Sequence, residues 1–279
     1  MFLNQRFYCD KKERIGKVAD KRQVIYYRDE LNDEFSVAQI TPRRIDGSYR
    51  YDHSSAWKKF THFFWYRIVA TPIAFLYTKL AFHHRVENRE VLKKFGKQAY
   101  FLYGNHTQDI ADALIPNLLY VPQETCVIVH PNNVSMPILG RITPSLGALP
   151  LPDDREAYRN FMATIEKRVA QNKKIVIYPE AHIWPYYTGI RPFPDTSFSY
   201  PIKYATPVFC FTNTYQKRRW SKKPRIVTYV DGPFYPNENV PLRARRTELR
   251  DRVHACMCER AKHSTVVKIQ YIKKDENDG

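Results

Sequence analysis

The sequence predicts an α/β fold in which a mixed β-sheet is flanked by helices, and two observations support this. After a charged connector that ends near residue 97, short apolar runs alternate with longer amphipathic segments, as in strands joined by helices. The 279 residues are 43 % hydrophobic and 14 % aromatic, which is enough to bury a sizeable core. One main domain with an N-terminal appendage is therefore expected.

Six apolar runs are expected to be strands, and three amphipathic segments are expected to be helices. The strands are predicted at 99–103, 125–130, 146–151, 174–178, 207–213 and 225–230. The helices are predicted near 107–119, 154–171 and 242–262. Because sites in α/β proteins collect where strands end, functional residues are expected just after these runs.

The N-terminal part divides into a polar lead-in at 1–55 and an aromatic-rich segment at 56–83, ahead of the main domain at 84–279. Within the second segment, Arg67 and Pro72 interrupt the apolar run, which disfavours a transmembrane span. Aromatic residues with flanking Lys and Arg favour helices that lie in the headgroup region of an anionic membrane. A buried core helix is the alternative.

Charge and cysteine content indicate the environment. The chain has 45 Lys and Arg against 28 Asp and Glu, a net charge of +17, which predicts an anionic partner: nucleic acid, anionic lipid, a phosphorylated metabolite or an acidic carrier protein. Five scattered cysteines predict a reducing compartment, and the charged N-terminus is unlike a signal peptide. The expected location is the cytoplasmic side of the cell.

The segment from Phe101 to Asp112 places a histidine where a predicted strand passes into a helix. There, His106 can act as a general base at neutral pH, and a carboxylate on the helix can fix its tautomer. Asp109 and Asp112 share one face of that helix, and either could do so. A capping role for His106 and Asp112 is the alternative that this segment alone leaves open.

The segment 174–187 is a second buried-looking strand that ends in chemically useful side chains. Its carboxyl end delivers Glu180 and His182, directly after Pro179. Strand ends in α/β sheets are the expected position of a substrate site.

Together, these segments resemble the PlsC-type glycerolipid acyltransferase family. Its first block, Asn-His-x-x-x-x-Asp, is matched by Asn105-His106 with Asp112, although Asp112 lies six residues after the histidine and Asp109 three. Its third block, Phe-Pro-Glu-Gly-Thr-Arg, is matched by Tyr178-Pro179-Glu180-Ala181-His182, without the arginine. The ranges 146–155 and 205–211 resemble the second and fourth blocks.

The resemblance implies transfer of a fatty acyl group from acyl-CoA or acyl carrier protein to a hydroxyl of lysophosphatidic acid or glycerol 3-phosphate. It implies His106 as base and Asp112, or failing that Asp109, as the orienting acid. The implied substrate-binding residues are Arg155, Glu180, His182 and Arg191, with Arg155 as phosphate ligand and Arg191 in place of the missing arginine. No cofactor or metal is implied, because the acyl thioester is a co-substrate.

The implied setting is the cytoplasmic membrane face, with an anionic membrane surface, the acyl donor and a phosphorylated glycerolipid as partners. The altered third block leaves two alternatives: an acyltransferase with a different acceptor, or a non-enzymatic basic protein that binds membrane or nucleic acid on this scaffold.

Other signals are weaker. A zinc site from His254, Cys256, Cys258 and His263 is disfavoured, since positions two apart on a helix point to different sides. The basic run 217–225 is interpreted as a solvated or lipid-facing surface, so no nucleic-acid partner is expected. Walker, dinucleotide and Gly-x-Ser-x-Gly motifs are missing from the sequence, which disfavours those enzyme classes.

Overall fold

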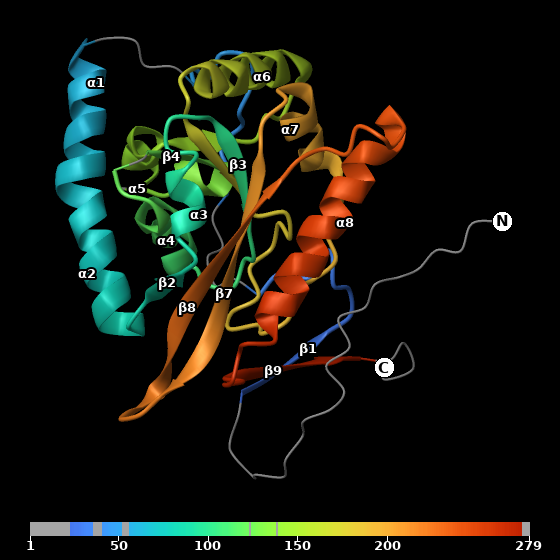
Figure 1. Cartoon of the computed structure of the whole chain (residues 1–279). Coiled ribbons are helices and arrows are strands. Elements are labelled where there is room, and N and C mark those ends of the chain that lie inside the picture. The colour runs from blue at the N-terminus through green and yellow to red at the C-terminus, as the bar shows by residue number, and fades with distance from the viewer. Residues whose placement is uncertain (1–22, 36–40, 52–55, 123, 138, 275–279) are drawn as a thin grey trace.

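A seven-stranded sheet forms the centre of the computed structural model, which describes residues 23–35, 41–51, 56–122, 124–137 and 139–274 (Figure 1). Its strands, in spatial order, are β2 (Arg85–Glu87), β8 (Ser221–Phe234), β7 (Val208–Arg218), β3 (Tyr100–Gly104), β6 (Lys174–Ile177), β4 (Thr125–Val129) and β5 (Ala148–Pro150). Neighbouring strands are parallel except β7 and β8, which are antiparallel. The predicted mixed sheet is confirmed.

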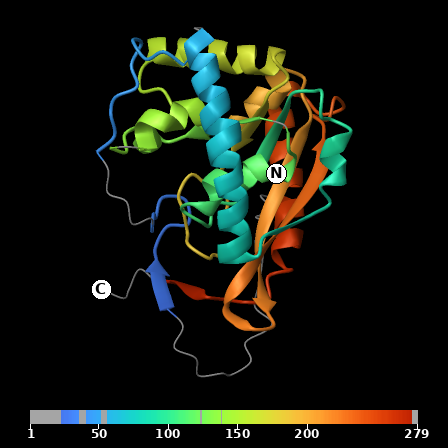
Figure 2. The same ribbon diagram turned by 90° about the vertical axis from the view of Figure 1, so that its left-hand side faces the viewer.

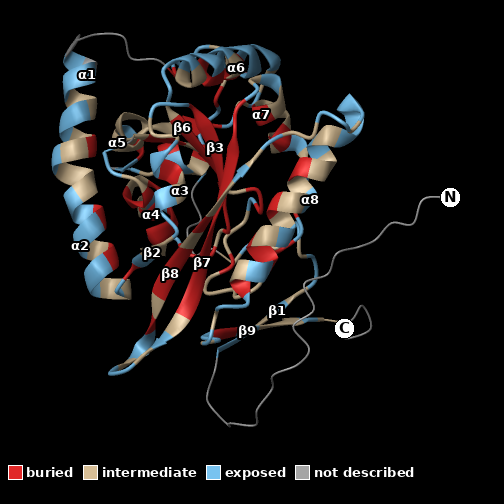
Figure 3. Ribbon diagram, in the orientation of Figure 1, coloured by how far each residue is buried: buried red, intermediate tan, exposed pale blue. Residues whose placement is uncertain are grey.

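Helices cover both faces of this sheet. Because side chains alternate along a strand, Phe101 and Tyr103 of β3 face one side, and Tyr100 and Leu102 face the other. The first side packs against α6 (Arg155–Ala170) and α8 (Leu242–Ala261), and the second against α3 (Glu90–Lys93) and α4 (Ala111–Leu119). Figure 3 shows the buried residues concentrated along the central strands. The sheet therefore supports a core on each face.

The shorter elements lie in the connections. They are the helices α5 (Leu139–Ile142) and α7 (Ser199–Lys203) and the 3-10 turns η2 (Pro131–Val134), η3 (Thr143–Leu146) and η4 (Thr196–Phe198).

The predicted elements occur in the predicted order, with two differences in extent. β7 and β8 extend beyond their apolar sections into a hairpin that pairs Arg218 with Ser221. This extension was not predicted because its side chains are mostly polar. The helix predicted from residue 107 begins at Ala111, because the Asp112 carboxylate accepts the backbone N–H groups of Thr107 and Gln108 and holds a turn there.

Parts of the predicted lead-in are built into the fold. Its residues Gln23–Tyr27 form β1, which pairs in parallel with β9 (Ile269–Lys273). Ile45 is fully buried, and the Tyr51 hydroxyl donates to the carbonyl oxygen of Pro150 at 2.9 Å. Residues 1–22 lie outside the described part. The domain boundaries stay a prediction.

The aromatic-rich segment forms one helical rod along the side of the molecule (Figures 1 and 2). It consists of α1 (Ala56–Phe63), the π-helical η1 (Phe64–Ala70) and α2 (Thr71–Phe82). Pro72 lies in the first turn of α2, where a missing N–H is tolerated, so it does not break the rod.

The rod is anchored through a narrow inner side. Tyr66 is 1 % exposed, and its hydroxyl donates to Asn117 Oδ1 at 2.7 Å and accepts from the Thr125 N–H at 2.8 Å. Its outer side exposes nine large apolar residues: Trp57, Phe60, Phe63, Phe64, Ile68, Ile73, Phe75, Leu76 and Leu80. The core-helix alternative therefore does not fit. Among the described helices, none combines the length and apolar character that crossing a bilayer requires.

Candidate active site

His106 and Asp112 meet at the carboxyl end of β3. The His106 Nδ1 lies 3.0 Å from Asp112 Oδ2; the imidazole is 19 % exposed and the carboxylate 1 %. Gly104 precedes the pair because a Cβ there would lie 2.1 Å from the Phe211 ring on the neighbouring strand. The structure thus brings together the histidine and the more distant of its two predicted carboxylate partners.

The Asp112 carboxylate accepts hydrogen bonds from several donors. Its Oδ2 accepts the N–H groups of Thr107 at 2.7 Å and Gln108 at 2.8 Å in addition to the imidazole. Its Oδ1 accepts the Asn213 amide at 3.1 Å. Asp109, in contrast, is an exposed residue, although partial desolvation of its carboxyl group raises the pKa of that group. Asp112 is therefore the carboxylate that orients the imidazole in this geometry.

Asn213 is a site residue that sequence analysis did not single out. It lies in the buried part of β7 beside β3, where its backbone N–H donates to Asn105 Oδ1 at 2.8 Å and its carbonyl accepts from Asn105 Nδ2 at 3.1 Å. Its own Oδ1 accepts the Thr228 hydroxyl at 2.6 Å, and His84 Nε2 lies 2.9 Å from that hydroxyl. Its position at the end of a predicted strand was the available signal.

Glu180 and Arg191 form a buried pair behind His106. The Glu180 carboxylate accepts the His106 N–H and the Arg191 N–H, each at 2.9 Å. Arg191 Nη2 lies 3.5 Å from Glu180 Oε2, and both side chains are 0 % exposed. Burial raises the pKa of Glu180, and the Arg191 charge opposes that shift. Both predicted substrate residues thus hold the backbone of the site rather than facing solvent.

The loop after β6 is fixed against the site and against the N-terminal segment. The N–H of Trp184 donates to the His106 carbonyl at 3.1 Å. Its indole N–H donates to the Asp33 carbonyl at 2.7 Å, and Arg191 stacks on its ring at 4.8 Å. Ala181 adopts a left-handed conformation with φ of 62°. The role of residues 28–35 in covering this loop could not be predicted from local sequence.

His182 and Arg155 occupy different places. His182 is 32 % exposed, and its Nδ1 lies 3.4 Å from Glu34 Oε2, at the edge of the loop. Arg155 is an exposed first residue of α6, following β5. β6 and β4 separate β5 from β3, so roughly 14 Å of sheet lies between the two strands. The structure therefore brings His106, Asp112, Glu180 and Arg191 together and leaves Arg155 outside that cluster.

The arrangement can perform general-base chemistry. The hydrogen bond to Asp112 assigns the proton of the His106 imidazole to Nδ1. Nε2 therefore carries the free lone pair. Tyr178 stacks on the imidazole with ring centroids 4.5 Å apart, and its hydroxyl donates to the Asp112 carbonyl oxygen. One face of the imidazole is therefore covered, which fixes the ring for proton transfer at Nε2.

One group of potential metal ligands occurs elsewhere in the described residues. Donor atoms of Cys210, Asp231 and Cys256 lie within 4.8 Å of one another. Arg260 donates two hydrogen bonds to the Asp231 carboxylate, which already neutralises that ligand. Cys258 faces His254 instead, with Sγ and Nδ1 3.7 Å apart, as expected for helical positions that point to different sides.

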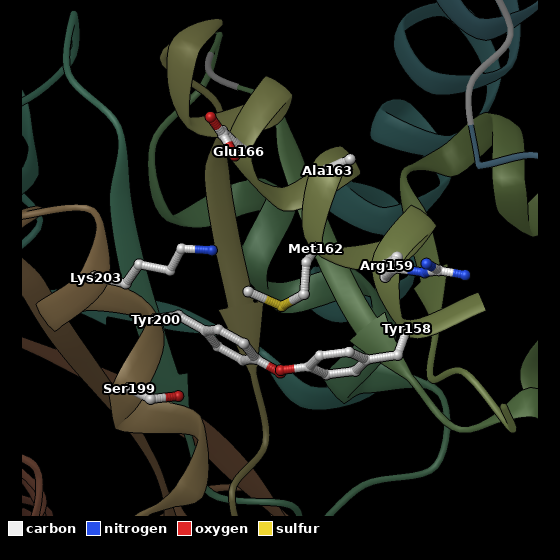
Figure 4. A pocket seen from close by; sticks show the side chains of 8 residues that line it. All are labelled: Tyr158, Arg159, Met162, Ala163, Glu166, Ser199, Tyr200 and Lys203. Atoms are coloured by element: carbon white, nitrogen blue, oxygen red, sulfur yellow. The ribbon is translucent and has the colours of Figure 1, made fainter. Parts of the chain in front are cut away.

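A hollow of about 510 Å³ opens between α6 and α7, away from the motif segments (Figure 4). Figure 4 shows Tyr158 and Tyr200 with their hydroxyls turned toward each other, Met162 above them and Lys203 at one side. None of its lining residues belongs to the His106 cluster.

Comparison with known proteins supports the fold. Residues 83–212 match the family model described as acyltransferase. The crystal structure of PlsC, the 1-acyl-sn-glycerophosphate (LPA) acyltransferase from Thermotoga maritima, aligns with a TM-score of 0.52 and 18 % identity, over 75 % of this chain and 89 % of that chain. Mitochondrial ATP synthase from Euglena gracilis aligns with a TM-score of only 0.19 and 8 % identity, over 76 % of this chain and 73 % of that chain. No curated protein matches the sequence significantly.

Proposed function

Because residues 83–212 match the acyltransferase family model, we propose that this protein moves a fatty acyl group from a thioester donor to a hydroxyl of lysophosphatidic acid or glycerol 3-phosphate. The donor is acyl-CoA or acyl carrier protein. The observation that supports this most is the His106–Asp112 pair at 3.0 Å, with the imidazole still partly accessible.

In the proposed reaction, His106 Nε2 removes the proton of the acceptor hydroxyl as its oxygen attacks the thioester carbonyl. The tetrahedral intermediate collapses to the new ester, the thiolate leaves, and the imidazolium returns its proton to that sulfur. Asp112 stabilises the imidazolium by charge and holds its tautomer. A thiolate is a good leaving group, so these steps need no metal or cofactor.

The acceptor phosphate is assigned to accessible basic side chains. Arg155 is exposed, and its guanidinium suits bidentate phosphate binding. His182 adds a partly exposed imidazole at the edge of the loop. Glu180 and Arg191 act as positioning residues, since their hydrogen bonds fix the backbone at His106.

The enzyme is proposed to attach to the cytoplasmic face of an anionic membrane through the helical rod. The support is the outer side of the rod, where Trp57 is 71 % exposed and Leu80 is 74 % exposed at the two ends. Such a surface suits the boundary between headgroups and acyl chains, where substrate lipids present their polar ends.

The test is thiol release from palmitoyl-CoA and palmitoyl-acyl carrier protein by wild type and by His106→Ala, with glycerol 3-phosphate or lysophosphatidic acid as acceptor. Acceptor-dependent release by wild type alone supports the proposal and identifies the pair. Release only with an amine or sugar acceptor would indicate the alternative acyltransferase, which the Ala181-His182 replacement motivates. Vesicle or nucleic-acid binding with no turnover for any pair would indicate the non-enzymatic alternative.

A further inference from the structure

The tip of the β7–β8 hairpin concentrates positive charge. A two-residue turn, Arg219-Trp220, joins the strands beyond the Arg218–Ser221 pair. Six of the nine residues from 217 to 225 are Lys or Arg, and no Asp or Glu occurs between residues 213 and 230. The tip is therefore a cationic segment with an aromatic residue at its apex.

These charges are exposed and unneutralised. Lys217, Arg219, Lys222 and Lys223 are exposed, and within the described ranges none of the four forms an ion pair. Trp220 is 87 % exposed, the highest value among the exposed large apolar residues, and Arg219 lies over its ring at 4.8 Å. An indole beside several cations is typical of side chains at a membrane–water interface.

The tip lies directly beyond the end of the rod. Arg218 Nη2 contacts His83 Nε2, the residue that follows α2. Figures 1 and 2, which differ by a quarter turn, both show the hairpin projecting past this end of α2. The exposed Leu80 is one turn of α2 away from His83. The cationic tip therefore continues the exposed apolar side of the rod.

We propose that the hairpin tip binds anionic lipid headgroups and forms a second membrane contact. This contact is electrostatic, whereas the contact through the rod is apolar. Trp220 inserts at the headgroup level while Lys217, Lys222 and Lys223 meet lipid phosphates and carboxylates. Nucleic acid or an acidic carrier protein would also suit the charge, but neither explains an exposed indole next to an apolar helix face. The proposal extends the membrane attachment above and is independent of the acyl transfer.

The test compares vesicle binding of the full chain with that of Lys222→Ala/Lys223→Ala. Each basic residue near an anionic surface contributes roughly fivefold, so the variant is expected to bind phosphatidylserine-containing vesicles roughly 25-fold more weakly at low salt. Binding to neutral phosphatidylcholine vesicles should be unchanged. Arg159→Ala/Arg243→Ala is the matched control: it removes two exposed charges on α6 and at the start of α8, and should change binding less than about twofold.

A second measurement reports on Trp220 itself. The Trp57→Phe/Trp65→Phe variant retains Trp184, which is 0 % exposed, and Trp220, which is then the accessible indole. Brominated lipid should therefore quench the fluorescence of Trp220. Unchanged binding of the lysine variant, equal weakening in the control, or no quenching would overturn the proposal. If the lysine variant binds vesicles normally but binds acyl carrier protein or nucleic acid more weakly, the tip is assigned to that partner. This result would also overturn the proposal.

Discussion

Polar groups are buried and hydrogen-bonded in the cluster around His106, whereas apolar side chains and cations are exposed on the outer surface of the rod and hairpin. In the cluster, each carboxylate oxygen of Asp112 and Glu180 accepts at least one hydrogen bond, although both side chains are almost fully buried. The rod exposes apolar residues, and at the tip Lys217, Arg219, Lys222 and Lys223 are exposed and form no ion pair within the described residues. Buried carboxylates that accept several hydrogen bonds specify one geometry, whereas an exposed apolar and cationic surface suits a fluid partner. Chemistry and attachment should therefore respond separately to mutation.

Replacing His106 by Ala is expected to have the largest effect. Loss of the general base should lower acceptor-dependent thiol release by about 1,000-fold. Vesicle binding should be unchanged, because the rod and the tip are untouched. A coenzyme A release assay measures turnover, and vesicle sedimentation measures membrane binding. Parallel loss of binding and turnover would break the separation of the two regions.

Asp112→Asn, in the first turn of α4, and Asp109→Asn, in the turn before that helix, form a matched pair. The first should lower kcat by about 100-fold, because an amide no longer holds the imidazole by charge; the second should change it less than about threefold. Thermal unfolding of both variants controls for loss of structure. A larger loss in Asp109→Asn would assign the orienting role to the exposed carboxylate.

His84 should make the buried network sensitive to acid. Burial, aided by the charges of Lys79 and Arg89, lowers the pKa of His84 from 6.5 to about 4. Below pH 6.5 the unfolded chain therefore binds a proton that the folded protein excludes. The contribution of neutral His84 to the free energy of unfolding is therefore complete above pH 6.5 and declines as the pH falls to 4. It amounts to roughly 3 kcal/mol. Urea unfolding across this range measures it.

His84→Gln should flatten this dependence, whereas replacing the exposed His130 by Gln should leave it intact. An unchanged slope in His84→Gln would show that His84 does not remain neutral in the folded protein.

The outer surface of the rod is tested by Phe63→Ser/Phe64→Ser/Trp65→Ser. Removing these aromatic groups should weaken binding to anionic vesicles by roughly thirtyfold, with turnover of water-soluble substrates retained. Leu242→Ser/Tyr235→Ser removes exposed apolar groups elsewhere, from residues that are 68 % and 51 % exposed, and should have little effect. Equal binding by the triple variant and wild type would remove the rod from membrane attachment.

The sequence predicted the parts that depend on local pattern. The apolar runs of β3, β4 and β6 and the approach of His106 to Asp112 follow from residues close together in the chain. Asn213 could not be assigned, because its place depends on the pairing of Gly104 with Phe211 between β3 and β7. Nor could the burial of Arg191, which depends on the distant carbonyl of Glu30 and the indole of Trp184.

The loop that carries Glu180 also contains the smallest expected effect. Ala181 has φ of 62°, a conformation that costs an alanine about 1 kcal/mol because of its Cβ. Ala181→Gly removes that strain but gives the unfolded chain more freedom, so stability should rise by only about 0.5 kcal/mol. Ala163→Gly, in the interior of α6, should instead lose about 1 kcal/mol. If urea unfolding shows both variants destabilised, Ala181 is not held in the left-handed region, and the hydrogen bonds of Glu180 do not fix the conformation of this loop.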